Sequence, residues 1–317
     1  MPFDLTKRLT AWRHHLHANP ELSLQESATA AFVCERLTEL GIPFTPAVGG
    51  HGVVATLSQG SSNRSVGLRA DMDALLIEEE TGLPYASTRP GVMHACGHDG
   101  HTASLLGAAK LLQDDPDWSG TVHFVFQPAE EGFGGAEAML NDGLLQRFPM
   151  ERIFGYHNWP GLELGTVMLH DGPLMAAAAN FSLTLTGHAG HAAMPHLTRD
   201  PVQGLAHLII AFNAIVARNT HPLEAAVIST CVLKAGEAAN QIPNSATLGG
   251  TFRAHSAELM QFIERRMREV AAHIAAGFGL TAEMTLGHYL PPTRNHKAEA
   301  DLAAEMVAGL GMKVRRD

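Results

Sequence analysis

The sequence predicts an α/β protein with two domains, the second inserted into the first. Its 317 residues exceed the roughly 250 over which a single hydrophobic core usually grows, so two cores are expected. The expected elements also change in order near residue 176, from strands alternating with helices to a β-α-β-β-α-β succession. That succession is typical of a four-stranded, ferredoxin-like sheet with two helices on one face. We expect a first domain over residues 1–176, an inserted α+β domain over 177–288, and a return to the first domain over 289–317.

The composition indicates a globular protein. Hydrophobic residues make up 45% and charged residues 17% of the chain, and the formal net charge is -10. This charge argues against a nucleic-acid surface, which needs clustered cations, and the apolar runs are too short to span a bilayer. The start of the chain lacks the apolar segment of a secretory signal, and three widely spaced cysteines suggest no disulfide framework. We expect a cytoplasmic protein.

Two helices are expected at the start of the first domain. Leucine and tryptophan recur at helical spacing over residues 5–17, and Pro20 ends this pattern. Ser23 and Glu26 match the S-x-x-E capping box, which predicts that a second helix begins there and ends before Gly41.

The strands of the first domain carry the candidate site residues at their carboxyl ends. Strands are expected at residues 52–57, 66–70, 121–126 and 152–156, and helices at 102–112 and 135–145. The last three strands lead directly to Asp71, to the pair Glu130 and Glu131, and to His157. Because α/β folds place their sites at this end of the strands, these side chains are expected to meet.

The stretch from residue 93 to 101 concentrates groups that bind metal. It contains Cys96 and His98, with glycines that allow sharp turns, and thiolate and imidazole both suit zinc and related metals. A cysteine-histidine nucleophile is the rival interpretation. The adjacent Glu130 and Glu131 favour the metal, since one carboxylate can bind it while the other acts as a base. Asp71 and Asp99 are candidates for supporting catalysis by orienting a ligand histidine, and the sequence does not favour Asp73 over Asp71.

The inserted domain offers groups that could bind a substrate. Strands are expected at residues 180–186, 226–233, 246–253 and 280–287, long helices at 201–218 and 258–277, and a further helix at 298–309. A histidine- and glycine-rich stretch covers residues 187–195, while Asn240 and Arg253 supply an amide and a guanidinium that could hold a carboxylate. Taken alone, each of these features is more commonly structural.

Five motifs in order resemble the M20 metallopeptidase family. They are RADMDAL at residues 69–75, MHACGHDGHT at 93–102, FQPAEEG at 126–132, HN at 157–158 and GHAGHAAMP at 187–195. The resemblance extends from about residue 13 to residue 288. It is to the amidohydrolase branch, which includes hippurate hydrolases, N-acyl-amino-acid amidohydrolases and auxin-conjugate hydrolases. A mixed-sheet, di-metal catalytic domain with an inserted dimerisation (lid) domain is the fold that this resemblance implies.

The resemblance also implies a set of metal ligands and a reaction. Two divalent metal ions (Zn, Mn, Co or Ni) would be bound by the set Cys96, His98, Glu131 and His157, with Cys96 bridging them. Glu130 would be the general base that activates water against the amide bond of an N-acyl amino acid, and then the acid that protonates the leaving amine.

Further roles follow from the same resemblance. His191 would act across a homodimer on the oxyanion in the partner's site. Asn240 and Arg253 would bind the substrate carboxylate or the oxyanion. Family members continue past residue 317 with a segment that supplies one more metal-binding histidine, so we expect a C-terminally truncated member. The alternative hypothesis is a catalytically impaired paralogue that acts as a dimerising or ligand-binding protein.

Overall fold

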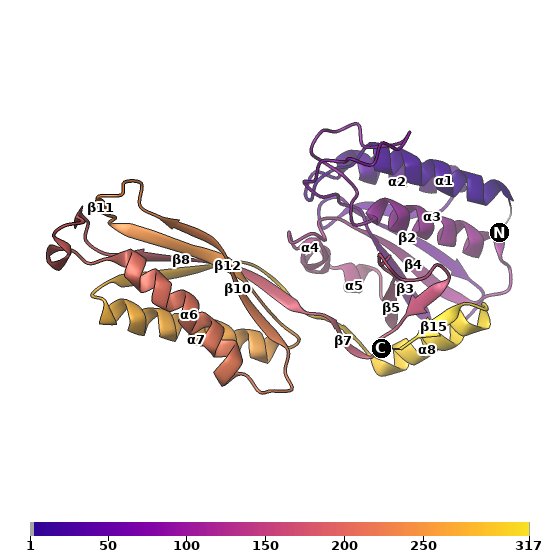
Figure 1. Ribbon diagram of the computed structural model, residues 1–317. Coiled ribbons are helices and arrows are strands. Elements are labelled where there is room, and N and C mark those ends of the chain that lie inside the picture. Colours follow the sequence, from indigo (N-terminus) through magenta and orange to yellow (C-terminus); the bar gives the residue numbers. More distant parts are fainter. Residues whose placement is uncertain (1–2, 317) are drawn as a thin grey trace. The chain divides into compact units, whose positions relative to one another are not determined.

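The computed structural model describes residues 3–316 (Figure 1). The chain forms two compact units, residues 1–162 and residues 163–317. The division expected from the sequence, with an inserted domain over residues 177–288, stays a prediction. The α/β class and the mixed sheet are confirmed.

The first unit is built on a five-stranded mixed sheet in the order β1-β2-β4-β3-β5. The strands are β1 (Phe44–Val48), β2 (Gly52–Gln59), β3 (Ser65–Asp71), β4 (Gly120–Gln127) and β5 (Arg152–Gly155). Strand β3 pairs in parallel with both β4 and β5, whereas β2 runs antiparallel to β4 and to β1. The carboxyl ends of β3, β4 and β5 therefore lie at one edge of the sheet.

Helices cover both faces of this sheet. One face packs against α1 (Phe3–Ala18), α2 (Ser27–Leu40) and α3 (His98–Asp114), with Leu37, Leu106 and Phe124 fully buried between them. The other face packs against the short helices α4 (Gly135–Asn141) and α5 (Leu144–Arg147) through Met139 and Leu144. Strand β4 is consequently buried along nearly its whole length, which agrees with its near-continuous apolar sequence.

The expected capping box at the start of α2 is wrong. Helix α2 begins at Ser27, and Glu26 occupies the N-cap position without a side-chain cap hydrogen bond. The Ser23 hydroxyl instead donates to Asp73, and the Glu26 carboxyl accepts from the backbone N–H of Ala129. Both side chains therefore bind segments far away in the sequence.

The second unit contains the expected β-α-β-β-α-β arrangement. Strands β8 (Ala177–Thr186), β10 (Ala226–Ala235), β12 (Ser245–Ala254) and β13 (Thr281–Leu290) form an antiparallel sheet in the order β10-β12-β8-β13. Helices α6 (Pro201–Asn219) and α7 (Ala257–Gly277) lie together on one face of it (Figure 1). By length and composition α6 could cross a membrane, but core helices pass the same test. Its Leu205, Leu208 and Phe212 are buried in the core of this unit.

Short elements complete the second unit. Strand β7 (Gly172–Met175) pairs with β14 (Thr293–Asn295), β15 (Lys313–Arg315) pairs in parallel with β6 (Thr166–Met168), and α8 (Lys297–Gly309) lies between β14 and β15 in the chain. Strand β9 (Gly190–His191) pairs with β11 (Gln241–Ile242), and a short 3-10 helix covers Pro195–Leu197. The pairing of β9 with β11 brings together two segments that the sequence analysis singled out separately.

Candidate metal centre

The predicted metal ligands lie together at the carboxyl edge of the first unit's sheet. Glu131 follows β4, His157 follows β5, and His98 is the first residue of α3. Cys96 lies just before that helix, and its Sγ is 3.3 Å from Nε2 of His157. One potential ligand atom from each of Cys96, His98 and Glu131 lies within 4.8 Å of the others. The parallel pairing of β3, β4 and β5 explains why residues so far apart in the chain meet here.

Gly97 shapes the turn between the two ligands Cys96 and His98. Its φ of 89° is in the left-handed region, which a residue with a side chain rarely adopts. A Cβ at this position would lie 2.3 Å from Oδ1 of Asn158, the residue next to His157. Gly97 therefore allows the Cys96–His98 turn to approach the end of β5 closely.

The two histidines of the predicted ligand set each use Nδ1 as a hydrogen-bond donor. His98 Nδ1 donates to Oδ1 of Asp73 at 3.2 Å, and His157 Nδ1 donates to the carbonyl oxygen of Asn158 at 2.6 Å. The Nε2 atom of each ring is thereby left to face the cluster, which is the arrangement of metal-binding histidines. The Nε2 of His98 is buried and has no hydrogen-bond partner among the described residues.

Carboxylates surround this unpartnered nitrogen. His98 Nε2 lies 3.6 Å from Asp71, 3.7 Å from Glu131 and 3.9 Å from Glu130. Burial lowers the pKa of His98, but its hydrogen bond with Asp73, the neighbouring thiol of Cys96 and the charges of Asp71 and Asp73 outweigh burial and raise it to about 11. Such a site strongly favours a positive charge, and the sulfur, nitrogen and oxygen donors present fit divalent metal ions.

Glu130 differs electrostatically from Asp71. Burial raises its pKa, and the neighbouring charge of Glu131 raises it further. Burial also raises the pKa of Asp71, but the hydrogen bond from His101 and the charge of Arg69 outweigh it and hold that pKa well below its usual range. Glu130 is thus more ready than Asp71 to take up a proton.

The cysteine-nucleophile interpretation receives less support. The neighbouring His98 imidazole lowers the pKa of the Cys96 thiol, but burial and the charge of Glu131 outweigh this effect, and the net shift is upward. Reactive cysteines instead have lowered pKa values in electropositive surroundings. The environment of Cys96 therefore fits a metal ligand better than a nucleophile.

Asp71 and Asp73 contact different histidines, and the one that contacts the predicted ligand His98 is Asp73. Asp73, which the sequence did not favour over Asp71, binds the predicted ligand His98 and also accepts the backbone N–H of Glu131 at 3.0 Å. Asp71 accepts a 2.6 Å hydrogen bond from Nδ1 of His101. Since His101 Nε2 accepts the N–H of Asn158 at 3.1 Å, both nitrogens of this ring are engaged within the protein. The position of Asp73 just after a predicted strand was the one sequence feature that could have indicated its role.

Asp99 is directed away from the candidate ligands, toward α1. It accepts hydrogen bonds from Nε of Arg13 at 3.1 Å and from Nδ1 of His17 at 2.9 Å. The other ring nitrogen of His17 lies 3.2 Å from Glu79. Asp99 therefore anchors the start of α3 to the first helix of the unit.

The candidate residues of the second unit fall into two places. His191 in β9 and Asn240 next to β11 are brought together, because the N–H of Ala192 donates to the carbonyl of Asn240 at 3.0 Å. Arg253 lies near the far end of β12, where it pairs with Ala178. All three candidates, His191, Asn240 and Arg253, are exposed.

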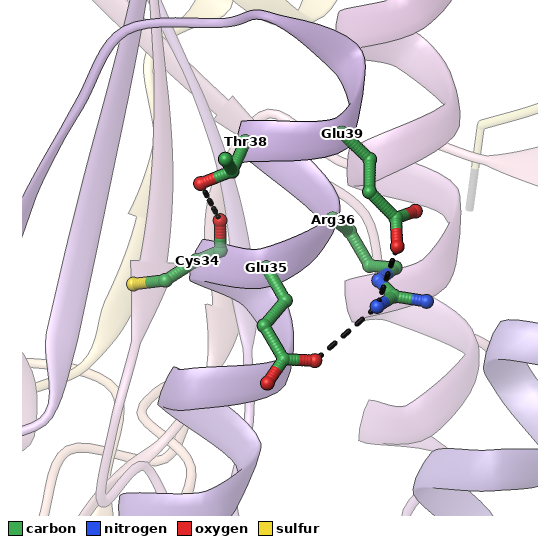
Figure 2. A pocket seen from close by; sticks show the side chains of 5 residues that line it. All are labelled: Cys34, Glu35, Arg36, Thr38 and Glu39. Carbon is green, nitrogen blue, oxygen red and sulfur yellow. Dashed lines mark hydrogen bonds and ion pairs between the residues drawn. The ribbon is translucent and has the colours of Figure 1, made fainter.

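A surface hollow on α2 is separate from these candidates. Figure 2 shows the residues that line it. Among them, Arg36 forms ion pairs with Glu35 at 3.2 Å and with Glu39 at 2.8 Å. Cys34 and Thr38 complete the lining. None of the candidate site residues contributes to this hollow.

Comparison with known proteins agrees with this geometry. The model for peptidase family M20/M25/M40 matches residues 67–317. The chain is 39% identical to a hippurate hydrolase of Campylobacter jejuni over 97% of its own length and 80% of that protein. It is 42% identical to an N-acetyl-L-cysteine deacetylase of Bacillus subtilis (95% and 72%) and 41% identical to an N-acyl-L-amino acid amidohydrolase of Geobacillus stearothermophilus (90% and 77%).

Solved structures show the same fold. A Bacillus subtilis protein described as a dinuclear metal-binding peptidase of the M20 family superposes with a TM-score of 0.84 at 37% identity, covering 99% of this chain and 82% of that one. An aminobenzoyl-glutamate utilization protein of Klebsiella pneumoniae superposes with a TM-score of 0.72 at 26% identity, covering 99% and 84%.

Proposed function

Because this chain belongs to peptidase family M20/M25/M40 and is a metal-dependent amidohydrolase, we propose that it hydrolyses the amide bond of N-acyl amino acids or similar small conjugates. Two relatives are named for N-acetyl-L-cysteine and for N-acyl-L-amino acids, which supports this substrate class. The observation that carries the proposal is the buried, unpartnered Nε2 of His98 beside the carboxylates of Glu131 and Glu130.

Two divalent metal ions are the proposed cofactors. Cys96, His98, Glu131 and His157 would hold these ions. Thiolate, imidazole and carboxylate together suit Zn, Mn, Co or Ni. When bound, the ions would polarise the amide carbonyl and lower the pKa of water.

Glu130 is the proposed general base and acid. Its raised pKa suits a carboxylate that takes a proton from the attacking water and holds it. As the C–N bond breaks, Glu130 gives this proton to the amine nitrogen, so that a carboxylic acid and a free amine leave. Asp71 would contribute indirectly, by holding His101 against the segment that carries His157.

The second unit is proposed to form a homodimer and to close over the substrate. The partner's His191 would donate to the oxyanion of the attacked carbonyl, and Asn240 and Arg253 would bind the substrate carboxylate. His191 Nδ1 accepts the N–H of Ala193, so its proton lies on the exposed Nε2, as a donor requires. Exposed Val232 and Leu233 on the edge strand β10 support association between copies. A cytoplasmic location is proposed with these roles, and Cys34, Cys96 and Cys231 are free thiols.

Metal content and turnover of the purified chain test this function together. Mass spectrometry would count the bound ions, and a panel of N-benzoyl and N-acetyl amino acids would measure hydrolysis. Two ions with turnover support the proposal. A chain that binds one ion or none and hydrolyses no member of the panel would instead be a catalytically impaired paralogue with a dimerising or ligand-binding role. Turnover that survives complete removal of metal would favour a Cys96 nucleophile.

A further inference from the structure

Glu26 is a buried carboxyl group to which the proposed reaction assigns no role. It is 0% exposed, and its Oε1 accepts the backbone N–H of Ala129 at 2.6 Å, across 103 residues of sequence. Its second oxygen has no hydrogen-bond partner among the described residues. The one distant backbone group that Glu26 binds is the N–H of Ala129, so the conformation of Ala129 is what this side chain can stabilise.

Ala129 is held in an unfavourable backbone conformation. Its φ of 49° is left-handed, which among the described non-glycine residues occurs only here and at Leu24 and Ala47. The Cβ of an L-residue disfavours this region, so a contact outside the turn must stabilise it. Ala129 directly precedes Glu130 and Glu131, and its left-handed turn directs the chain from the end of β4 so that both carboxylates face His98.

The rest of this turn is closely packed. The carbonyl of Ala129 accepts the N–H of Gly135 at 3.1 Å, and a Cβ on Gly135 would lie 1.7 Å from the carbonyl oxygen of Pro128. The carbonyl side of Ala129 is therefore bound from within the turn, while its N–H is bound from outside by Glu26.

We propose that Glu26 is a positioning residue for the Glu130–Glu131 turn, whose carboxyl oxygen holds the Ala129 N–H and thereby keeps both carboxylates directed at the metal-binding cluster. This inference rests on the proposed function for the roles of Glu130 and Glu131. Glu26 acts through reach and hydrogen-bond geometry, and its negative charge is dispensable. Burial raises the pKa of Glu26 and outweighs the backbone hydrogen bonds, including the one from Ala129, that lower it.

Two substitutions separate reach from charge. Glu26→Gln keeps the length of the side chain and an acceptor oxygen, whereas Glu26→Asp keeps the charge but withdraws the oxygen by one methylene. We expect Glu26→Asp to lower Zn²⁺ or Mn²⁺ affinity and kcat by about 10- to 100-fold, the usual effect of losing a group that orients metal ligands. Glu26→Gln should remain near the unsubstituted protein in both quantities, and KM should change little in either.

Glu21→Asp is the matched control. Glu21 is a buried glutamate of the same segment, but its carboxylate binds the N–H and hydroxyl of Thr29 at 2.7 and 2.9 Å, at the start of α2. Its substitution should lower the unfolding temperature without changing metal affinity. A further variant, Glu26→Asp with Ala129→Gly, should recover part of the lost affinity, because glycine adopts a left-handed φ without a steric penalty.

Hydrogen-deuterium exchange of the Ala129 amide tests the proposal independently of metal and of turnover. Its protection should fall in Glu26→Asp and persist in Glu26→Gln, including in the metal-free protein. The inference is overturned if Glu26→Gln damages metal affinity as much as Glu26→Asp, or if the Ala129 amide exchanges equally in all variants. An unsubstituted chain that binds no metal would overturn the proposed function, while the exchange measurement would still decide the role of Glu26.

Discussion

Asp73 contacts two predicted metal ligands at once, since its Oδ1 lies 3.2 Å from Nδ1 of His98 and its Oδ2 accepts the N–H of Glu131. One carboxylate therefore links the start of α3 to the turn after β4. Ser23 donates to the same carboxylate at 2.6 Å and fixes it from a third segment. Such contacts orient metal-binding residues, so this buried carboxylate supports the geometry of the ligand cluster.

Asp73→Asn should lower metal affinity by about 10- to 100-fold. The carboxylate of Asp73 accepts from His98 with one oxygen and from Glu131 with the other, whereas an asparagine amide has a single oxygen. At least one of the two ligands therefore loses its orientation. Competition with a chelating dye would measure the affinity of each variant. Ser23→Ala, which removes only one donor to Asp73, is the control and should have a smaller effect; an equal loss in both variants would contradict the linking role.

Glu130→Gln should abolish amide hydrolysis while metal remains bound. The substitution removes the proton acceptor but not the ligand Glu131, and a general base contributes on the order of 10²- to 10⁴-fold. Turnover and metal content would be measured on the same preparation. Glu131→Gln is the control and should lose metal as well as turnover. Near-normal hydrolysis by Glu130→Gln would show that another group moves the proton.

The metal-free and metal-bound proteins should respond oppositely to pH. The pKa of His98 is raised from 6.5 to about 11 in the fold, so its contribution to stability is fully present below pH 6.5 and is lost as pH rises toward 11. A metal ion must displace the same proton, and its affinity should therefore increase with pH. Unfolding temperatures with EDTA and with saturating metal, compared from mildly acid to mildly alkaline pH, would measure both trends.

The control for the pH experiment is His98→Asn, in which the alkaline loss of stability of the metal-free protein should disappear. The pKa values of Asp71 and Asp73 are lowered in the fold, so their contributions are present above their usual value near 3.8 and are lost only in stronger acid. An alkaline loss that persists without His98 would assign the effect to another group.

His191→Ala should impair hydrolysis through the partner subunit. If His191 acts across the dimer, a mixed dimer of His191→Ala with Glu130→Gln chains contains one site with both groups intact. Mixing the two inactive variants should therefore restore part of the activity, whereas neither variant alone should gain any. Activity measured after subunit exchange, with dimers confirmed by light scattering, would decide this. Full activity of His191→Ala alone would remove the cross-dimer role.

Local sequence patterns predicted those parts of the site that depend on strand and helix periodicity. The apolar run of β4 and the strands β3 and β5 placed Glu131 and His157 correctly at one edge, because parallel strands have to end together. The β-α-β-β-α-β order of the second unit was visible from the same strand and helix periodicity, although its strands are antiparallel. Strand β1, which is short and contains Pro46 at the sheet edge, was not expected.

Long-range contacts account for what the sequence misplaced. Ser23 and Glu26 have the spacing of a capping box, but their partners lie 50 and 103 residues away, where no local pattern points. Asp71 and Asp73 both follow β3, and which of them faces His98 depends on the backbone after the strand and on the packing of α3. The residues next to Ser23, Glu26, Asp71 and Asp73 in the sequence do not indicate which distant groups these side chains bind.

The close approach of Gly97 to Asn158 implies a constraint on how related chains can diverge. Any side chain at position 97 would meet the amide of Asn158 and would also have to adopt a left-handed φ of 89°. The amide at position 158 can move aside or be replaced by a smaller side chain, but neither change removes the backbone requirement at position 97. Glycine should consequently persist at position 97 in an alignment of the family, whatever residue stands at position 158.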